Sequence, residues 1–175
     1  MLGRYKGFPE VTHGRARFIC QGSVRDVQQS MLSSFHRLTQ EIYRLDAIAP
    51  HMSSDCEVGF DFGVAEDMVF NYLDEQELDR SRKDINKEEL PIMDLFCAVH
   101  YHTANKNGKR VPLKFDYHLI RFIFHRNSVN LWIHHERGPQ RVPLEELITF
   151  LANRINEELS KSQIKPLKLE YLRTL

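Results

Sequence analysis

Three antiparallel strands are predicted from residues 95–136, which read LFCAVHYHTANKNGKRVPLKFDYHLIRFIFHRNSVNLWIHHE. β-Branched and aromatic residues are concentrated in three segments of this stretch, 95–103, 111–125 and 129–136. Asn107-Gly108 lies between the first two segments and is typical of a two-residue type I′ turn. A second turn is expected near Asn127-Ser128. The stretch is therefore expected to form a three-stranded meander.

A strand and a long amphipathic helix are predicted before the meander. Residues 15–20 alternate between arginine and apolar side chains, as a half-buried strand does. Ser23 and Asp26 have the spacing of a helix N-cap. Apolar residues then recur at steps of three and four, at Val24, Val27, Met31, Phe35, Leu38, Ile42 and Leu45. We expect one helix from Ser23 towards Pro50, with its apolar stripe packed on a sheet.

The next segment changes from apolar alternation to charge. Residues 55–62 alternate without error and predict a strand, and residues 64–73 have the spacing of a short helix. Residues 74–90 are almost entirely charged or polar, so they have little apolar surface with which to pack. We expect this segment to be an exposed charged insert, either a helix extension or a mobile loop.

A second long helix and a final strand are predicted after the meander. Pro143 is suited to a first helical turn, and apolar residues follow at Leu144, Leu147, Ile148, Leu151, Ile155 and Leu159. The alternation of Leu167, Leu169 and Tyr171 indicates an edge strand. The expected class is α+β, an antiparallel sheet packed with two long amphipathic helices, in the order β-α-β-(charged insert)-β-β-β-α-β.

Length and composition restrict the class of protein. With 175 residues, the chain is expected to form a single domain, residues 1–175. No apolar run has the length of a membrane span, and no apolar segment follows the N-terminus as in a secretory signal. The three cysteines form no C-x-x-C pair. A cytoplasmic protein without a membrane association is expected.

Strand register tests whether the nine histidines gather into a site. If both turns contain two residues, Cys97 lies opposite His118 and Ile120 opposite His135. The same register places His102 opposite Leu113 and Arg121 opposite His134. Cys97, His118 and His135 then share one face, with Asp116 two residues from His118. His100, His102, His125 and His134 fall on the other face, where His100 and His134 are about 20 Å apart and cannot share a metal.

Two interpretations of the Cys97, His118 and His135 cluster remain open. A cysteine with two histidines suits zinc or an activated thiolate, and Asp116 would orient a histidine through its ring N–H. In the alternative, Cys97 is a small buried apolar residue and the histidines are hydrogen-bonded within the sheet. The zinc spacing H-x-x-x-H is missing, so no cofactor is expected and zinc is the alternative.

Nucleic-acid binding is a further alternative, through a basic hairpin tip. Its cations are Lys106, Lys109, Arg110 and Lys114. The chain has 24 basic and 24 acidic residues, so it has no overall positive charge to support such binding. The sequence also lacks the glycine-rich motifs that hold nucleotide phosphates. The net charge is zero because an acid-rich segment is balanced by basic patches. Opposed patches of this kind favour recognition of a protein.

The meander is apolar on both faces. The face opposite Cys97 carries large side chains at Phe96, Phe115, Tyr117 and Trp132. If both helices cover one face, a second chain, the C-terminal strand, the charged insert or an apolar ligand must cover the other; in the alternative, one helix packs on each face. The leading hypothesis is a module that acts by protein or small-ligand binding, self-associates as a homodimer and has no catalytic chemistry of its own.

Overall fold

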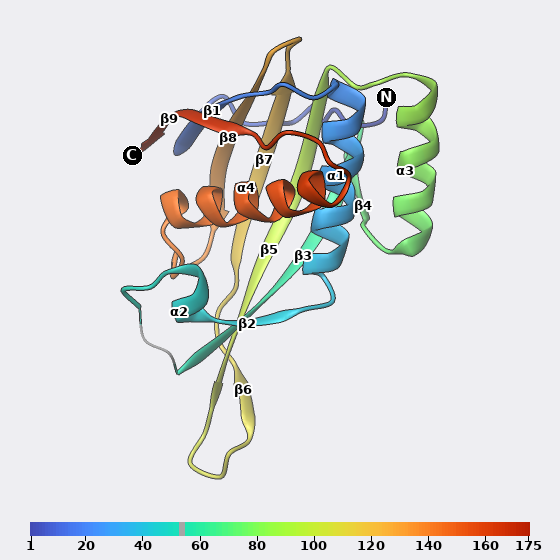
Figure 1. Cartoon of the computed structure of the whole chain (residues 1–175). Coiled ribbons are helices and arrows are strands. Elements are labelled where there is room, and N and C mark those ends of the chain that lie inside the picture. The colour runs from blue at the N-terminus through green and yellow to red at the C-terminus, as the bar shows by residue number, and fades with distance from the viewer. Residues whose placement is uncertain (53–54) are drawn as a thin grey trace.

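The computed structural model describes residues 1–52 and 55–175, and its centre is a nine-stranded antiparallel sheet (Figure 1). The strands are β1 (Gly14–Ile19), β2 (Ile42–Arg44), β3 (Cys56–Glu66), β4 (Val69–Tyr72), β5 (Ile92–Ala104), β6 (Arg110–Pro112), β7 (Asp116–Phe124), β8 (Ser128–Arg137) and β9 (Lys168–Thr174). Their order is β2-β3-β5-β7-β8-β1-β9, with β4 paired to β3 and β6 to β5. The α+β class is confirmed.

Helices gather on one side of the sheet. They are α1 (Val24–Leu38), α2 (Leu45–Ile48), α3 (Glu75–Lys87) and α4 (Leu144–Lys161). Figure 1 shows α1 and α4 in front of the strands and α3 beside α1. The strand residues that point towards these helices are fully buried, as Met93, Leu95 and Val99 are. Within the described residues, no helix is long and apolar enough to cross a membrane.

The meander forms from β5, β7 and β8, with two corrections to its turns. The first hairpin has Lys106, Asn107 and Gly108 in its loop, because the Asn105 N–H donates to the Lys109 carbonyl at 2.8 Å. Only Gly108 in that loop has a positive φ, +73°, so the expected type I′ turn is wrong. The added loop residue places His102 opposite Pro112 rather than Leu113.

The second turn comes one residue earlier than expected. The His125 N–H donates to the Ser128 carbonyl at 2.8 Å, so Arg126 and Asn127 form the turn. The register therefore moves by two residues: His135 lies opposite His118 instead of Ile120, and Arg121 opposite Trp132 instead of His134. An even shift leaves every side chain on its expected face.

Helix α1 is shorter than its apolar spacing predicts. Ser23 caps it as expected, since its hydroxyl accepts from the Asp26 N–H at 3.1 Å. The helix ends at Leu38, and Ile42 lies in β2, where its side chain is exposed. Residues of β2 pair with the free edge of β3. That pairing overrides the helical spacing, because it satisfies backbone groups that the edge of β3 would leave open.

The structure of residues 64–90 differs from the expected short helix and charged insert. Residues 64–73 form a β-hairpin, β3 to β4, that turns at Asp67 with a φ of 57°. Residues 75–87, expected to be an exposed helix extension or loop, form α3, which Asp74 caps. Its polar side is held by α1, where the Arg25 and Gln29 side chains donate to backbone carbonyls of α3. Ile85 is fully buried.

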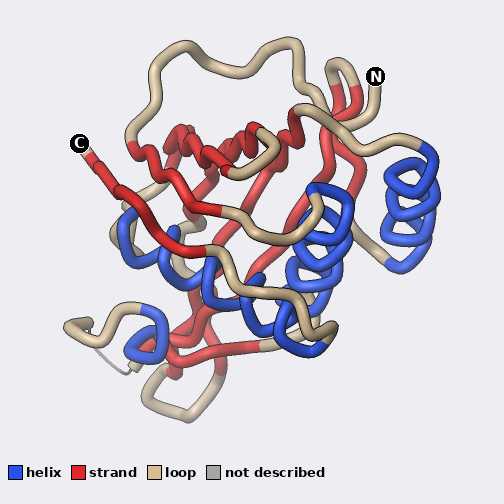
Figure 2. The backbone as a smooth tube through the Cα atoms, turned by 45° about the horizontal axis from the view of Figure 1, so that its top comes forward, coloured by secondary structure: helices blue, strands red, loops and turns tan. Residues whose placement is uncertain are grey.

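The N-terminal segment, residues 1–12, lies on the side of the sheet away from the helices (Figure 2). The Gly3 N–H donates to the Ala65 carbonyl at 2.7 Å, and the Asp94 N–H donates to the Gly3 carbonyl at 2.5 Å. The segment thus fills the gap where β3 and β5 diverge, and then crosses towards β1. We call this side of the sheet the helix-free face; the N-terminal segment is a cover that the sequence analysis did not consider.

Candidate functional site

Cys97, His118 and His135 form a row across β5, β7 and β8 on the helix-covered side. Cys97 lies opposite His118, and His118 lies opposite His135. The first two side chains are fully buried. Burial raises the pKa of the Cys97 thiol, so the thiol stays protonated at neutral pH. Burial also lowers the pKa of His118 to about 3, so its ring is neutral.

Hydrogen bonds assign the tautomers of this histidine pair. The His135 Nε2 lies 3.0 Å from the Gly138 carbonyl and must donate to it. The His135 Nδ1 is then an acceptor, and the His118 Nδ1 donates to it across 3.3 Å. This leaves the His118 Nε2 as a buried acceptor without a partner in the described residues. The two rings are bonded to each other within the sheet, and the His118 ring is neutral.

Asp116 does not orient a histidine. Its carboxylate accepts from the Tyr101 hydroxyl at 2.5 Å and from the backbone N–H groups of Gln140 and Arg141 at 2.5 and 2.9 Å. Asp116 therefore holds the loop that follows β8. In the part of the chain that the structure describes, no group of three or more His, Cys, Asp or Glu is placed to hold a metal. The geometry thus gives the zinc alternative no support.

The basic hairpin tip lies far from the rest of the sheet surface. Figure 1 shows the loop before β6 projecting beyond the helices. Lys106, Lys109 and Lys114 are exposed. Arg110 lies within 3.4 Å of the His102 ring and 3.9 Å of the Glu57 carboxylate. Among the described residues, none of these four cations lies over a Phe, Tyr or Trp ring, so the tip offers charge without a stacking surface.

A series of aromatic rings crosses the helix-free face, and we call it the aromatic row. It runs through Tyr5, Phe70, Phe96, Tyr117, Phe115 and His100. Successive ring centroids are 4.7, 6.0, 5.5, 6.0 and 4.3 Å apart. All six side chains are half-buried. The row joins β4, β5, the start of β7 and the N-terminal segment into one surface.

Arginine side chains lie over rings on the same face. The Arg137 guanidinium lies 5.2 Å from the Tyr117 ring centroid, and Arg15 lies 4.5 Å from that of Trp132. Arg173 of β9 lies 5.9 Å from the ring centroid of Tyr171. Of the residues expected to form an interface, Phe96, Phe115 and Tyr117 therefore meet in one row. Trp132 stands apart from them, under Arg15.

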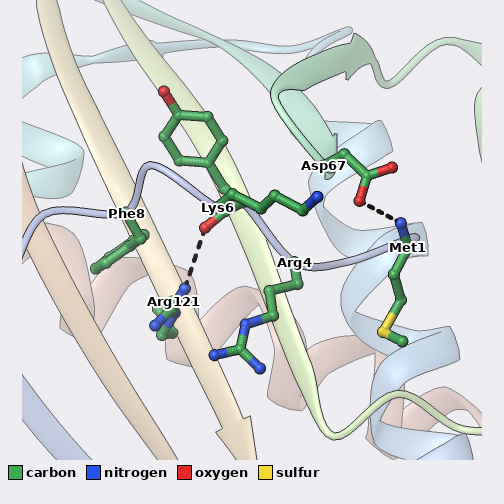
Figure 3. A pocket seen from close by; sticks show the side chains of 7 residues that line it. Met1, Arg4, Lys6, Phe8, Asp67 and Arg121 are labelled. Atoms are coloured by element: carbon green, nitrogen blue, oxygen red, sulfur yellow. Dashed lines mark hydrogen bonds and ion pairs between the residues drawn. The ribbon is translucent and has the colours of Figure 1, made fainter.

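A pocket of about 560 Å³ opens where the N-terminal segment crosses β5 and β7 (Figure 3). It is lined by Met1, Arg4, Tyr5, Lys6, Phe8, Asp67 and Arg121. Figure 3 shows the guanidinium groups of Arg4 and Arg121 on the same side of the segment. The Met1 ammonium is paired with Asp67 at 2.5 Å. The remaining cations face a small opening next to Tyr5, the first ring of the aromatic row.

Arg121 is fixed in this pocket. Its Nε and Nη2 donate to the two oxygens of Asp94 at 2.7 and 2.8 Å, and its guanidinium lies 4.3 Å from the Phe8 ring centroid. Sequence reasoning missed both Asp94 and the N-terminal segment. An acid inside the apolar strand IMDLFCAV was the available signal, since a buried carboxylate needs a partner.

Comparisons with known proteins give no relative: no family model matches the chain, and no curated protein or solved structure matches it significantly.

Proposed function

We propose that this chain is a binding module without catalytic chemistry of its own, and that its helix-free face is the binding surface. The observation that carries the proposal is the aromatic row. Monomeric proteins rarely leave contiguous apolar surface uncovered, and large uncovered patches mark interaction sites. Half-buried rings with arginine beside them also match the composition of binding surfaces, where aromatic residues and arginine are enriched.

The helix-covered side supports the non-catalytic part of the proposal. A catalytic cysteine needs a thiolate, and burial raises the pKa of Cys97 instead. His118 is closed off from solvent, and Asp116 is occupied by the loop at residues 140–141. The positions of Cys97, His118 and Asp116 therefore support a role in stability rather than in catalysis.

The test is a ¹⁵N NMR titration with a panel of probes: a random peptide library, mononucleotides, an oligonucleotide and a hydrophobic dye. We expect at least one class to shift the amide signals of Phe96, Tyr117 and Trp132 while those of Lys106 and Lys109 stay unchanged. Shifts confined to the hairpin tip or to the Cys97 row, or none with any class, would contradict the proposal.

Self-association through β9 is a second candidate, because one edge of this strand has no neighbour among the described residues. Leu169 is 50% exposed and Tyr171 41% exposed, in a strand of seven residues. Strand edges without a neighbour are templates for pairing with another chain. Sedimentation velocity should show a dimer for the unaltered chain and a monomer for Leu169→Lys, and a monomer for both would dismiss this candidate.

We also propose that the protein is located in the cytoplasm. Cys20, Cys56 and Cys97 are all buried and free, which suits a reducing cytoplasm.

A further inference from the structure

We infer that the helix-free face binds single-stranded nucleic acid, with bases stacked on its rings and phosphates held by its arginines. This inference rests on the proposed function, because it names the ligand of the same face. Proteins that bind single strands without reading sequence combine stacking rings with a cationic surface. Both features are present here, on the one face that no helix covers.

Accessible rings flank the aromatic row at both edges of the sheet. Tyr72 of β4 is 53% exposed, and its hydroxyl donates to Asp61, which also contacts His100 at the end of the row. Tyr171 of β9 lies at the opposite edge. Rings are thus distributed across the whole width of the face, as a ligand of several linked bases requires.

Most acids of this face have a basic partner, which is a cation for four of them and a histidine ring for Asp61 and Glu136. The pairs are Glu57 with Arg110, Asp61 with His100, Asp67 with the Met1 ammonium, Asp94 with Arg121, Glu136 with His134, and Glu170 with Arg17. Within the described residues, five cations of the face form no ion pair: Arg4, Lys6, Arg15, Arg137 and Arg173. These five cations outnumber the three acids without a permanently charged partner, Glu10, Asp61 and Glu136, so the face has an excess of positive charge, although the whole chain is neutral.

Acidic residues are concentrated elsewhere in the fold. The segment that contains α3, residues 74–89, has seven acids and four bases, and α3 packs against α1 beside the helix-covered side (Figure 1). Charge separation of this kind orients a polyanion towards the helix-free face. Arginines next to rings, such as Arg137 at 5.2 Å from the Tyr117 ring centroid, keep N–H groups for phosphate.

The geometry favours an unpaired strand over a duplex or an acidic protein. A duplex is read by an element that enters a groove, and the helices lie on the other side of this sheet. An acidic protein would use the cations but gives the rings no planar partners. Unpaired bases offer a flat π-face to each ring, whatever their sequence.

Fluorescence anisotropy of labelled oligonucleotides tests the inference with the full chain. The probes are oligouridylate and oligodeoxythymidylate of about twelve nucleotides, a length that spans one sheet face, and a duplex of the same length. We expect both single strands to bind at about 50 mM NaCl, more weakly at about 200 mM, and the duplex to bind at least about tenfold less tightly. Polyglutamate should not displace the bound strand.

Surface variants locate the site without disturbing the core. Tyr72→Ser removes an exposed ring and should weaken binding by about tenfold. Arg4→Ala and Arg137→Ala should each weaken binding and reduce its dependence on salt. Controls are Lys106→Ala with Lys109→Ala at the hairpin tip, and Arg37→Ala on the helix-covered side, which should bind as the unaltered chain does.

The inference is overturned if single strands do not bind at about 100 µM protein, the weak limit of non-specific binding. It is also overturned if the duplex binds equally well, if polyglutamate competes, or if only the hairpin variant loses affinity. In that event the NMR panel separates the two proposals: peptide or dye binding at Phe96 and Tyr117 would keep the binding module and reject nucleic acid as its ligand.

Discussion

The Arg121 guanidinium and the Asp94 carboxylate form a two-point ion pair under the N-terminal segment, at 2.7 and 2.8 Å. Asp94 is fully buried, and its Oδ2 also accepts from the Tyr5 N–H at 2.7 Å. Arg121 in turn donates to the Tyr5 carbonyl at 3.4 Å. One ion pair therefore fastens the segment to β5 and β7 and places Tyr5 at the start of the aromatic row.

Asp94→Asn should destabilise the fold by about 3 kcal/mol, because breaking a buried pair leaves a charge without its partner. Urea unfolding followed by circular dichroism measures the loss. Asp46→Asn is the matched control, since Asp46 pairs with Arg44 in an exposed position and should cost less than about 1 kcal/mol. Equal losses in the two variants would show that the Asp94 pair does not anchor the segment.

Gly3→Ala should release the N-terminal segment. Gly3 has a φ of +90°, and an added Cβ would meet the Ile92 carbonyl oxygen at 2.7 Å. Limited trypsin digestion should therefore cut after Arg4 and Lys6 faster than in the unaltered chain. Gly59→Ala is the control, because an added Cβ there meets nothing within 4 Å. Unchanged cleavage in Gly3→Ala would contradict the described path of the segment.

His118 should make the fold sensitive to acid. Burial lowers its pKa from 6.5 to about 3. The unfolded chain therefore binds a proton below pH 6.5 that the folded chain refuses until about pH 3. The contribution of His118 to the free energy of unfolding is therefore complete above the pKa of the unfolded chain. It decreases as the pH falls from that pKa towards the folded pKa, by up to about 1.4 kcal/mol per pH unit.

Urea unfolding at about pH 5 and pH 7.5 checks this dependence on protonation. His118→Gln removes the titrating ring and should lose less stability between the two pH values than the unaltered chain. The same pH dependence in both proteins would mean that His118 is protonated in the fold, against its buried position.

Cys97 should be inert in the folded protein. Burial raises the pKa of its thiol, and its side chain is inaccessible. Iodoacetamide at neutral pH should therefore modify Cys97 only after unfolding. Mass spectrometry of peptides from native and denatured protein measures this. Rapid modification in the native state would restore the hypothesis of a reactive thiol.

The parts of the fold set by strong periodicity were predictable from sequence. The alternation in residues 95–136 predicted β5, β7 and β8, and the even shift in register kept Cys97, His118 and His135 on one face. Positions that depend on tertiary pairing were not predictable. Ile42 keeps the helical spacing of α1 but lies in β2, because the edge of β3 is free to pair.

The candidate site was predicted in part. Phe96, Phe115 and Tyr117 were expected on one uncovered face, and the structure brings them together. The N-terminal segment has no periodicity, so its path over that face could not be predicted. Its position depends on the ion pair between Asp94 and Arg121 and on the backbone hydrogen bonds of Gly3. The sequence pattern does not indicate which residues these two groups contact.

Trp132 gives the most direct measurement of the central claim, that the helix-free face is a binding surface for single strands. It is the only tryptophan in the chain and lies on that face under Arg15. Titration with oligouridylate at about 50 mM NaCl should quench its fluorescence to saturation, and about 200 mM NaCl should weaken the effect. Fluorescence that does not change with oligouridylate concentration would contradict the claim.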